Sequence, residues 1–347
     1  MIDPGRYVCL QGTTGRIAAR FTDETPNPRP AMRLTHSRAV LLMVLVTLMW
    51  STAGLVSRHL EAARSFEVTF WRSGFNAVAL TVALLAMRGT ARLWRDIGGG
   101  GRALWASALC WAVMYTNFML AITLTTVAMV LITMSIAPLL TALFARVLLG
   151  HRLPRRTWVA IGVVGLGIGW MFGRQAMGMG GTASGMRGAL VALGVPLAGA
   201  ANWTLLQHLQ QRQARNPARR APDMLPAVLL GALISALVSW PLSRPWSANA
   251  HDLSLLALLG VFQLALPCLL VVRLARVLPA PEISLIGLLE VVFGVALVWL
   301  GAGEAPGSSA LQGGSVVIAA LLVNEWLALR ERQALKRALQ AGTGPVS

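Results

Sequence analysis

Long apolar stretches with few charges recur along the whole 347-residue chain. About 20 consecutive apolar residues are enough for a helix to cross a bilayer. Hydrophobic residues make up 56% of the chain and charged residues only 12%, whereas soluble domains carry about a quarter charged residues. We therefore predict an all-α polytopic membrane protein with ten transmembrane helices. They span about residues 39–57, 66–87, 103–122, 126–148, 157–173, 187–206, 224–243, 253–272, 281–301 and 310–329.

The basic residues lie mostly between these helices, and their distribution predicts the orientation. With both termini on the same side, 23 of the 30 Lys and Arg residues fall on that side and five on the other. Cytoplasmic segments of membrane proteins carry such an excess. We therefore predict that both termini are cytoplasmic. The net charge of +17 then reflects topology, and we expect no nucleic-acid partner.

Polar segments flank and divide the helical part. Residues 1–37 are rich in Arg, Thr and Pro and lack an apolar core, so we expect a disordered cytoplasmic tail rather than a signal peptide. Met1 and Met32 both remain candidate starts. The segment 178–185, GMGGTASG, predicts a flexible linker between two halves. Residues 331–347 are expected to form a cytoplasmic C-terminal tail.

A weak internal repeat relates the fourth and ninth predicted helices. Pro138 precedes His151 by 13 residues, and Val291 precedes Glu304 by the same spacing. A repeat of five helices makes its second copy enter the membrane from the opposite side. We therefore predict two inverted five-helix repeats, 38–173 and 187–330. Inverted repeats are a frequent plan of secondary transporters, with the substrate site near the midplane between the halves.

Short motifs in the predicted helices point to one transporter group. They are LMWSTAG around Trp50, FWRSGFN around Arg72, YTNFMLAITLTT from Tyr115, MSIAP ending at Pro138, and SLIGLLEVVFGVALVWLGAGE ending at Glu304. With these motifs the chain resembles the EamA-like ten-helix branch of the drug/metabolite transporter superfamily over about residues 38–330. The resemblance implies a transporter of small metabolites.

Two positions depart from the pattern of that family. Glu290 is followed by Val291, where the family usually has proline, and His151 replaces the Glu expected after the fourth helix. Proline inside a helix removes a backbone hydrogen bond and kinks the helix. We therefore expect a straighter helix over 281–301 than the family pattern implies.

Two ionisable residues lie inside predicted helices. Arg72 is about six residues into the second helix, where an arginine costs roughly 2.5–3.5 kcal/mol on insertion scales. It either binds an anion or gates the path, or it is structural, pairing with Glu67 or reaching the interface. Glu290 lies in the middle of the ninth helix and either binds a substrate amine or a coupling proton, or joins two helices as a hydrogen-bonded acid.

Uncharged candidates for a substrate site are polar or aromatic. Tyr115 and Asn117 lie in the third helix and Gln263 in the eighth, where each either lines a cavity or joins helices. Trp50 and Trp203 lie in the first helix of each half. They either form aromatic walls that stack on a planar or cationic ligand, or they are packing residues.

Three prolines, Pro138, Pro196 and Pro267, lie inside the fourth, sixth and eighth helices. Each frees a backbone carbonyl, which is tolerated where protein or a water-filled cavity satisfies it. We expect kinks there, with hinges for alternating access as the alternative.

The sequence lacks the signatures of several other classes of protein. Cys9, Cys110 and Cys268 form neither a disulfide framework nor a metal-binding pattern. No phosphate-binding loop and no Ser/His/Asp constellation is present. We therefore predict no metal, no cofactor, no ATP-driven transport and no enzymatic activity.

Together these features predict a multi-pass secondary transporter of the bacterial inner membrane that exports small metabolites such as amino acids, amines or drug-like compounds. Its partners are the lipid bilayer and a small-molecule substrate. Proton coupling and facilitated diffusion both remain open, as do a monomer and a homodimer. The alternatives are a membrane-embedded enzyme or regulatory subunit, and a sugar-nucleotide or lipid translocator of the same superfamily, which we expect to place more basic residues in its cavity than Arg72.

Overall fold

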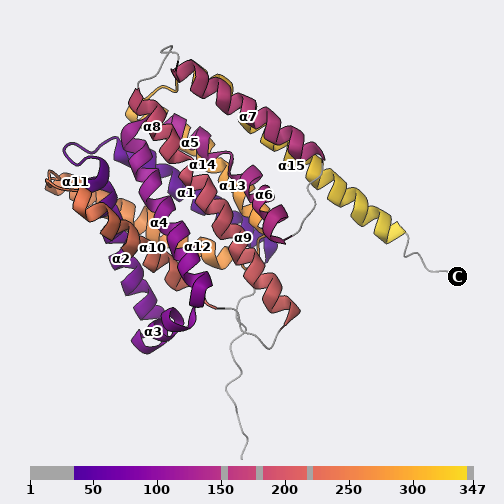
Figure 1. The fold of residues 1–347 in the computed structure, drawn as a ribbon, viewed down its shortest axis with the longest axis horizontal. Coiled ribbons are helices and arrows are strands. Elements are labelled where there is room, and N and C mark those ends of the chain that lie inside the picture. The colour runs from indigo at the N-terminus through magenta and orange to yellow at the C-terminus, as the bar shows by residue number, and fades with distance from the viewer. Residues whose placement is uncertain (1–34, 150–154, 177–182, 217–221, 342–347) are drawn as a thin grey trace, which may run out of the picture. The chain divides into compact units, whose positions relative to one another are not determined.

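The computed structural model describes residues 35–149, 155–176, 183–216 and 222–341, and every regular element in them is a helix (Figure 1). This confirms the all-α class for the described residues. The first part of the chain contains α1 (His36–Ser57), α2 (Ser65–Arg88), α3 (Thr90–Gly99), α4 (Gly101–Leu124), α5 (Val127–Met134), α6 (Ala137–Leu149) and α7 (Arg155–Ala176). The second contains α8 (Ala183–Ala192), α9 (Gly194–Arg215), α10 (Leu225–Ser239), the 3₁₀ helix η1 (Trp240–Leu242), α11 (Ala250–Leu258), the π-helical segment η2 (Leu259–Ala265), α12 (Leu266–Leu274), α13 (Ala280–Gly287), α14 (Leu289–Ala302) and α15 (Ser308–Ala341).

Some predictions fall outside the described residues. These are most of the N-terminal tail, most of the linker 178–185, and His151. At the other end, α15 continues to Ala341, so most of the predicted tail 331–347 is helical.

Within the described residues, eight helical stretches are long and apolar enough to cross a bilayer, judged by length and composition. They coincide with eight of the ten predicted spans. The other two predicted spans, 157–173 and 310–329, fall within α7 and α15, whose apolar stretches Trp158–Gly167 and Leu311–Ala320 are shorter. The structure thus supports a polytopic membrane protein, and the number ten stays a prediction.

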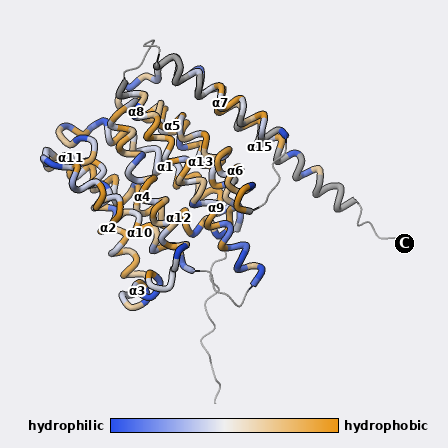
Figure 2. The backbone as a smooth tube through the Cα atoms, in the orientation of Figure 1, coloured by the Kyte–Doolittle hydropathy of each residue, from blue (hydrophilic) through white to orange (hydrophobic). Residues whose placement is uncertain are grey.

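Hydropathy changes along the direction of the helices (Figure 2). Hydrophilic residues gather beside α11 at one end, and at α3 and the end of α9 at the other, with hydrophobic residues between them. Large apolar side chains are exposed on the middle segments, including Val82 at 63%, Leu166 at 76% and Leu300 at 84%. A contiguous apolar surface of this kind is rare on soluble monomers but suits contact with lipid.

Prolines account for three interruptions of the long helices. The fourth predicted helix is interrupted at Ser135 and Ile136, the sixth at Leu193, and the eighth by η2. Pro138, Pro196 and Pro267 then fall in the first turn of α6, α9 and α12. In a first turn the missing proline N–H has no hydrogen-bond partner to lose. The helices are therefore interrupted near each of the three prolines, as the prediction of kinks implies, while a change of direction there stays a prediction.

The predicted helix over 281–301 is not continuous, while its straightness relative to the family pattern stays a prediction. The helix is interrupted at Leu288, where the amide of Leu288 bonds to the Leu285 carbonyl at 3.0 Å and the Val291 amide bonds to the Leu288 carbonyl at 3.0 Å. These bonds span three residues rather than four, which tightens the backbone. Gly287, directly before the interruption, weakens the helix at that point.

The helices of the two parts pair in matching ways. Helix α1 packs on α14 as α9 packs on α6, and α2 packs on η2 as α10 packs on α4. Helix α2 also packs on α10, and α7 on α15, so these two pairs join corresponding helices of the two parts. The pairing is that of two related halves, while their inversion in a membrane stays a prediction.

Charged residues tie connections together at the end where α2 terminates. Arg88 donates hydrogen bonds to Asp96 of α3 at 2.9 Å and to Asp223, before α10, at 2.5 Å. Arg276, after α12, lies 3.4 Å from the same Asp223 carboxylate. Burial alone would raise the pKa of Asp223, but the Leu225 amide and Arg88 outweigh it and hold that pKa below its usual 3.8.

We predict that Asp223→Asn lowers the free energy of unfolding by about 1–3 kcal/mol at neutral pH, since a charged hydrogen-bonded group is lost. Because the folded-state pKa is depressed, this stabilisation is present above about pH 4 and fades as the pH falls through the folded-state value. Thermal unfolding of the purified protein in detergent between pH 7 and pH 3 measures both effects. The control Glu61→Gln alters a side chain that is 66% exposed and should have little effect. An equal loss for Asp223→Asn at every pH would contradict the prediction.

Candidate functional site

A cavity of about 130 Å³ lies among the helices of both parts of the chain. Six of the seven residues predicted to bind substrate line it, and they come from six helical segments. They are Trp50 of α1, Arg72 of α2, Tyr115 of α4, Trp203 of α9, Gln263 of η2 and Glu290 of α14. Residues separated by up to 240 positions in the sequence are thereby brought to one place.

Arg72 is the most confined charged group of this cavity, with only 2% of its surface exposed. Its Nη2 donates to the Gln263 side-chain oxygen at 2.8 Å, whereas Nε and Nη1 are buried and have no partner among the described residues. Glu67 is not its counterion, because that carboxylate accepts hydrogen bonds from the Ser247 and Ala248 amides. Unpaired buried donors are costly, so an acceptor that enters the cavity would gain by bonding to these two nitrogens.

Gln263 connects Arg72 to a third helix. While its oxygen accepts from Arg72, its Nε2 donates to the Trp50 carbonyl of α1 at 3.1 Å. A glycine one turn earlier permits this geometry: a Cβ at Gly260 would lie 2.8 Å from the Arg72 carbonyl oxygen and the Asn76 nitrogen. The backbone of η2 therefore approaches α2 closely. Short π-helical segments of this kind are frequent at functional sites.

Glu290 places a carboxyl group on another wall of the cavity. It is the second residue of α14, two residues after the interruption at Leu288, and 9% of its surface is exposed. Within the described part of the chain, no hydrogen bond or ion pair engages its carboxylate, so the hydrogen-bonded alternative finds no support there. Arg72 and Glu290 thus share one cavity without a direct ion pair.

Aromatic rings form much of the remaining wall, and sequence analysis missed two of them, Trp111 and Phe118. Trp111 lies 5.5 Å from Tyr115 and 5.5 Å from Trp203, measured between ring centroids. Phe118 places its ring 5.6 Å from the Arg72 guanidinium carbon. Trp111, Tyr115 and Phe118 recur at helical spacing on one face of α4, and that pattern would have revealed Trp111.

Thioethers and hydroxyls complete the lining. Met43, Met114 and Met134 contribute flexible apolar surface, which adapts readily to ligands of different shape. Ser135 and Ser284 also line the cavity, although both hydroxyls already contact neighbouring protein groups. The cavity is therefore mainly apolar, with few polar groups that can direct a ligand.

Asn117 does not line this cavity. Its Nδ2 donates to the Val191 carbonyl at 3.2 Å and so joins α4 to α8, next to Gly194. Its neighbour Thr116 contacts Ser235 of α10 at 2.9 Å. The polar cluster of the third predicted helix is thus divided between the cavity and two helix contacts.

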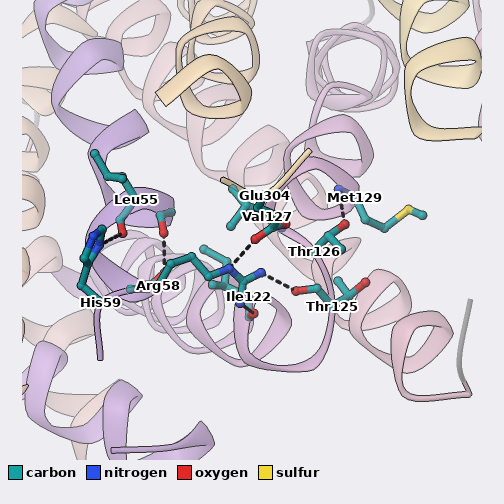
Figure 3. Close-up of polar contacts among 11 residues, drawn as sticks. Leu55, Arg58, His59, Ile122, Thr125, Thr126, Val127, Met129 and Glu304 are labelled. Carbon is teal, nitrogen blue, oxygen red and sulfur yellow. Dashed lines mark hydrogen bonds and ion pairs between the residues drawn. The ribbon is translucent and has the colours of Figure 1, made fainter. Parts of the chain in front are cut away.

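At the end of the bundle where α1 terminates, Arg58 and Glu304 form a bridge across three connections (Figure 3). The Arg58 Nε donates to Glu304 at 2.5 Å, and its terminal nitrogens donate to the carbonyls of Ile122 at 3.3 Å and Thr125 at 3.0 Å. The Glu304 carboxylate also accepts from the Val127 amide at 3.0 Å. We call this the Arg58–Glu304 bridge.

The Arg58–Glu304 bridge lies close to the cavity wall along the same helices. Ile122 follows the cavity residue Phe118 by one turn, and Val127 precedes the cavity residue Leu131 by one turn. Gly303 ends α14 in the left-handed conformation, with φ of 65°, and so turns the chain directly before Glu304. The bridge thus fixes the helix ends that lie about one turn from two residues of the cavity wall.

Comparison with known proteins identifies one family and one fold. A family model described as the EamA-like transporter family matches residues 37–173 and again residues 186–325. No curated protein matches the sequence. A solved crystal structure is similar at 18% identity, with a TM-score of 0.59 over 85% of this chain and 99% of that chain. At this identity the likeness shows the shared fold alone.

We predict that Gln263→Leu lowers the free energy of unfolding by about 1–3 kcal/mol, because the buried Arg72 loses its hydrogen-bond acceptor. Gln263→Glu keeps an acceptor and should destabilise less than Gln263→Leu. Apparent melting temperatures in detergent provide the comparison. If the leucine variant were as stable as the parent protein, the Gln263 contact would have no structural weight.

For the Arg58–Glu304 bridge, Glu304→Gln is expected to cost about 1–3 kcal/mol of stability, since one charged partner of several hydrogen bonds disappears. Arg58→Lys keeps the charge but loses the planar guanidinium fork, so it should also destabilise. Proteolysis of the loop connections and thermal unfolding measure the effect. Unchanged values for both variants would show that the bridge is energetically neutral.

Proposed function

The chain belongs to the EamA-like transporter family, and we propose that it is a secondary transporter whose central cavity binds small amphipathic metabolites. The observation that carries this proposal is the pair of opposite charges, Arg72 and Glu290, on the walls of one aromatic cavity. Neither charge is neutralised by an ion pair within the described residues. Such a site suits a ligand that brings both an anionic and a cationic group.

The free donors of Arg72 define one half of the proposed ligand. Nε and Nη1 donate from different edges of the planar guanidinium group, so each can give a separate charge-assisted hydrogen bond to an anionic ligand group such as a carboxylate. A ligand ammonium group would then face Glu290. The rings of Trp111 and Trp203 provide an apolar or cation-binding wall for the rest of the molecule. Amino acids and related amines fit this chemistry.

The arrangement of the helices supports a route through the membrane. We propose ten spans in two inverted halves, with both termini in the cytoplasm of a bacterial cell and the cavity between the halves. Matching helix pairs in the two parts of the chain and the placement of Trp50 and Trp203 in corresponding first helices support this plan. Alternating access around a central site follows from such repeats.

The proposed direction of transport is export of the substrate, and the proposed coupling ion is the proton. Glu290 is the only acidic residue among those that line the central cavity, so a transported proton would be carried there. A sugar-nucleotide translocator is a weaker candidate, because Arg72 is the only basic residue in the same lining. Recognition of a diphosphate would call for more cationic groups.

The test is transport into liposomes that contain the purified protein, with a panel of amino acids and amines, with and without a pH gradient. Arg72→Gln is expected to raise the apparent KM for amino acids about tenfold or more, since charged hydrogen bonds are worth about 1.5–3 kcal/mol. Amines without a carboxylate should be affected less. Glu290→Gln should abolish the response to the pH gradient.

Arg187→Gln and Glu282→Gln serve as controls, because both residues lie outside the cavity lining. They should transport like the parent protein. Equal transport rates for Glu290→Gln and the parent protein at every pH would show that Glu290 does not couple protons to transport. A well-folded Arg72→Gln variant with unchanged KM would show that Arg72 has a structural role and does not bind the substrate.

A further inference from the structure

A second and larger cavity, of about 1100 Å³, lies at the end of the bundle where α2 and α9 terminate. Its walls come from α3, the last turns of α9, the segment before α10, and the end of α12. The charged and amide side chains among them are Arg92, Arg95, Asp96, Gln210, Gln213, Asp223 and Arg276. We call it the arginine cavity.

The arginine cavity carries an excess of positive charge that the protein does not neutralise. Both of its carboxylates, Asp96 and Asp223, accept hydrogen bonds from Arg88, whose side chain is only 10% exposed. Arg92 lies 4.0 Å from Asp96, at the limit of an ion pair. Arg95 has no carboxylate partner in the described part of the chain. Together with Arg88 and Arg276, four guanidinium groups face two carboxylates.

Neutral groups in the same walls add hydrogen-bonding capacity. The Gln213 side chain has no hydrogen-bond partner among the described residues, while the Gln210 amide nitrogen donates to the Ala275 carbonyl. Leu206 and Val272, both buried, form an apolar floor. The side chains of Arg92 and Arg276, 59% and 57% exposed, line this cavity and remain open to solvent, so a ligand can reach them.

Helix α3, which lines the arginine cavity, carries residues that suit a membrane–water interface. It follows α2 after the single residue Gly89, so it begins where that predicted span ends. Leu93 turns toward the protein and is buried, whereas Trp94 is 67% exposed. Tryptophan is enriched at membrane–water interfaces, and short helices with basic and apolar faces lie in that layer.

We propose that the arginine cavity binds the phosphate group of an anionic phospholipid, with Arg92, Arg95 and Arg276 as its ligands. Phosphate oxygens accept the paired donors of guanidinium groups, and basic pockets between membrane helices suit such headgroups. Soluble phosphate shares this chemistry, so the experiment must separate the two sources. The proposal is independent of the transport activity proposed above.

The experiment uses the full chain in detergent, titrated with phosphatidylglycerol, phosphatidylcholine or inorganic phosphate, and read by native mass spectrometry and thermal unfolding. Phosphatidylglycerol is expected to bind and to raise the apparent Tm, whereas phosphatidylcholine should bind at least tenfold more weakly. The double variant Arg92→Gln/Arg95→Gln should lose at least tenfold in affinity for phosphatidylglycerol.

The matched control is Arg102→Gln/Arg187→Gln, which removes the same charge from two exposed arginines outside the cavity lining. Its affinity should stay within twofold of the parent protein. Arg95→Lys keeps the charge and should retain most of the binding if the double variant fails for electrostatic reasons rather than through misfolding. Equal affinity of the two double variants would overturn the proposal. Arginine-dependent binding of inorganic phosphate without binding of phosphatidylglycerol would overturn the lipid assignment.

Discussion

A guanidinium group withdrawn from water must be given hydrogen-bond acceptors by the protein around it, and in this chain Arg72 sets that requirement. Its one acceptor, Gln263, reaches it because Gly260 lets the π-helical segment η2 approach α2 closely. Gln263 in turn donates to the backbone of α1 at Trp50. The hydrogen-bond requirement of the Arg72 side chain thereby positions three helices from the two parts of the chain.

The two donors that Arg72 keeps free explain why the centre is a cavity rather than a packed core. An arginine whose donors all had hydrogen-bond partners in the protein would have a structural role only. A protein with a hydrophobic residue of similar size in its place would be as stable. Here Glu290 lies on another wall without a direct ion pair among the described residues, and aromatic rings line the cavity between the two polar groups. The unpaired donors of Arg72 therefore lower the stability of the protein at a place where a bound ligand can restore it.

Charged residues play different parts at the two ends of the bundle. Where α1 ends, Arg58 and Glu304 satisfy each other and nearby backbone groups, and the connections are held together. Where α2 ends, Arg88 donates hydrogen bonds to both Asp96 and Asp223, and Arg95 has no carboxylate partner among the described residues. Arginine and acidic side chains thus join the connections at one end of the bundle. At the other end they leave a cavity with positive charge that the protein does not neutralise.

The apolar runs by themselves determined the helical class, eight of the helices that suit a membrane, and the interruptions near Pro138, Pro196 and Pro267, because hydrophobicity and proline act locally. The cost of a charge in an apolar helix also singled out Arg72 and Glu290. Only the tertiary structure decided that Asn117 leaves the cavity while Trp111 enters it, since the two lie on different faces of α4. The tertiary structure also decided the interruption at Leu288. It likewise decided the helix α3, because the few apolar residues of α3 do not indicate a membrane span. Which side chains meet depends on how the helices pack, and packing joins residues that no local pattern connects.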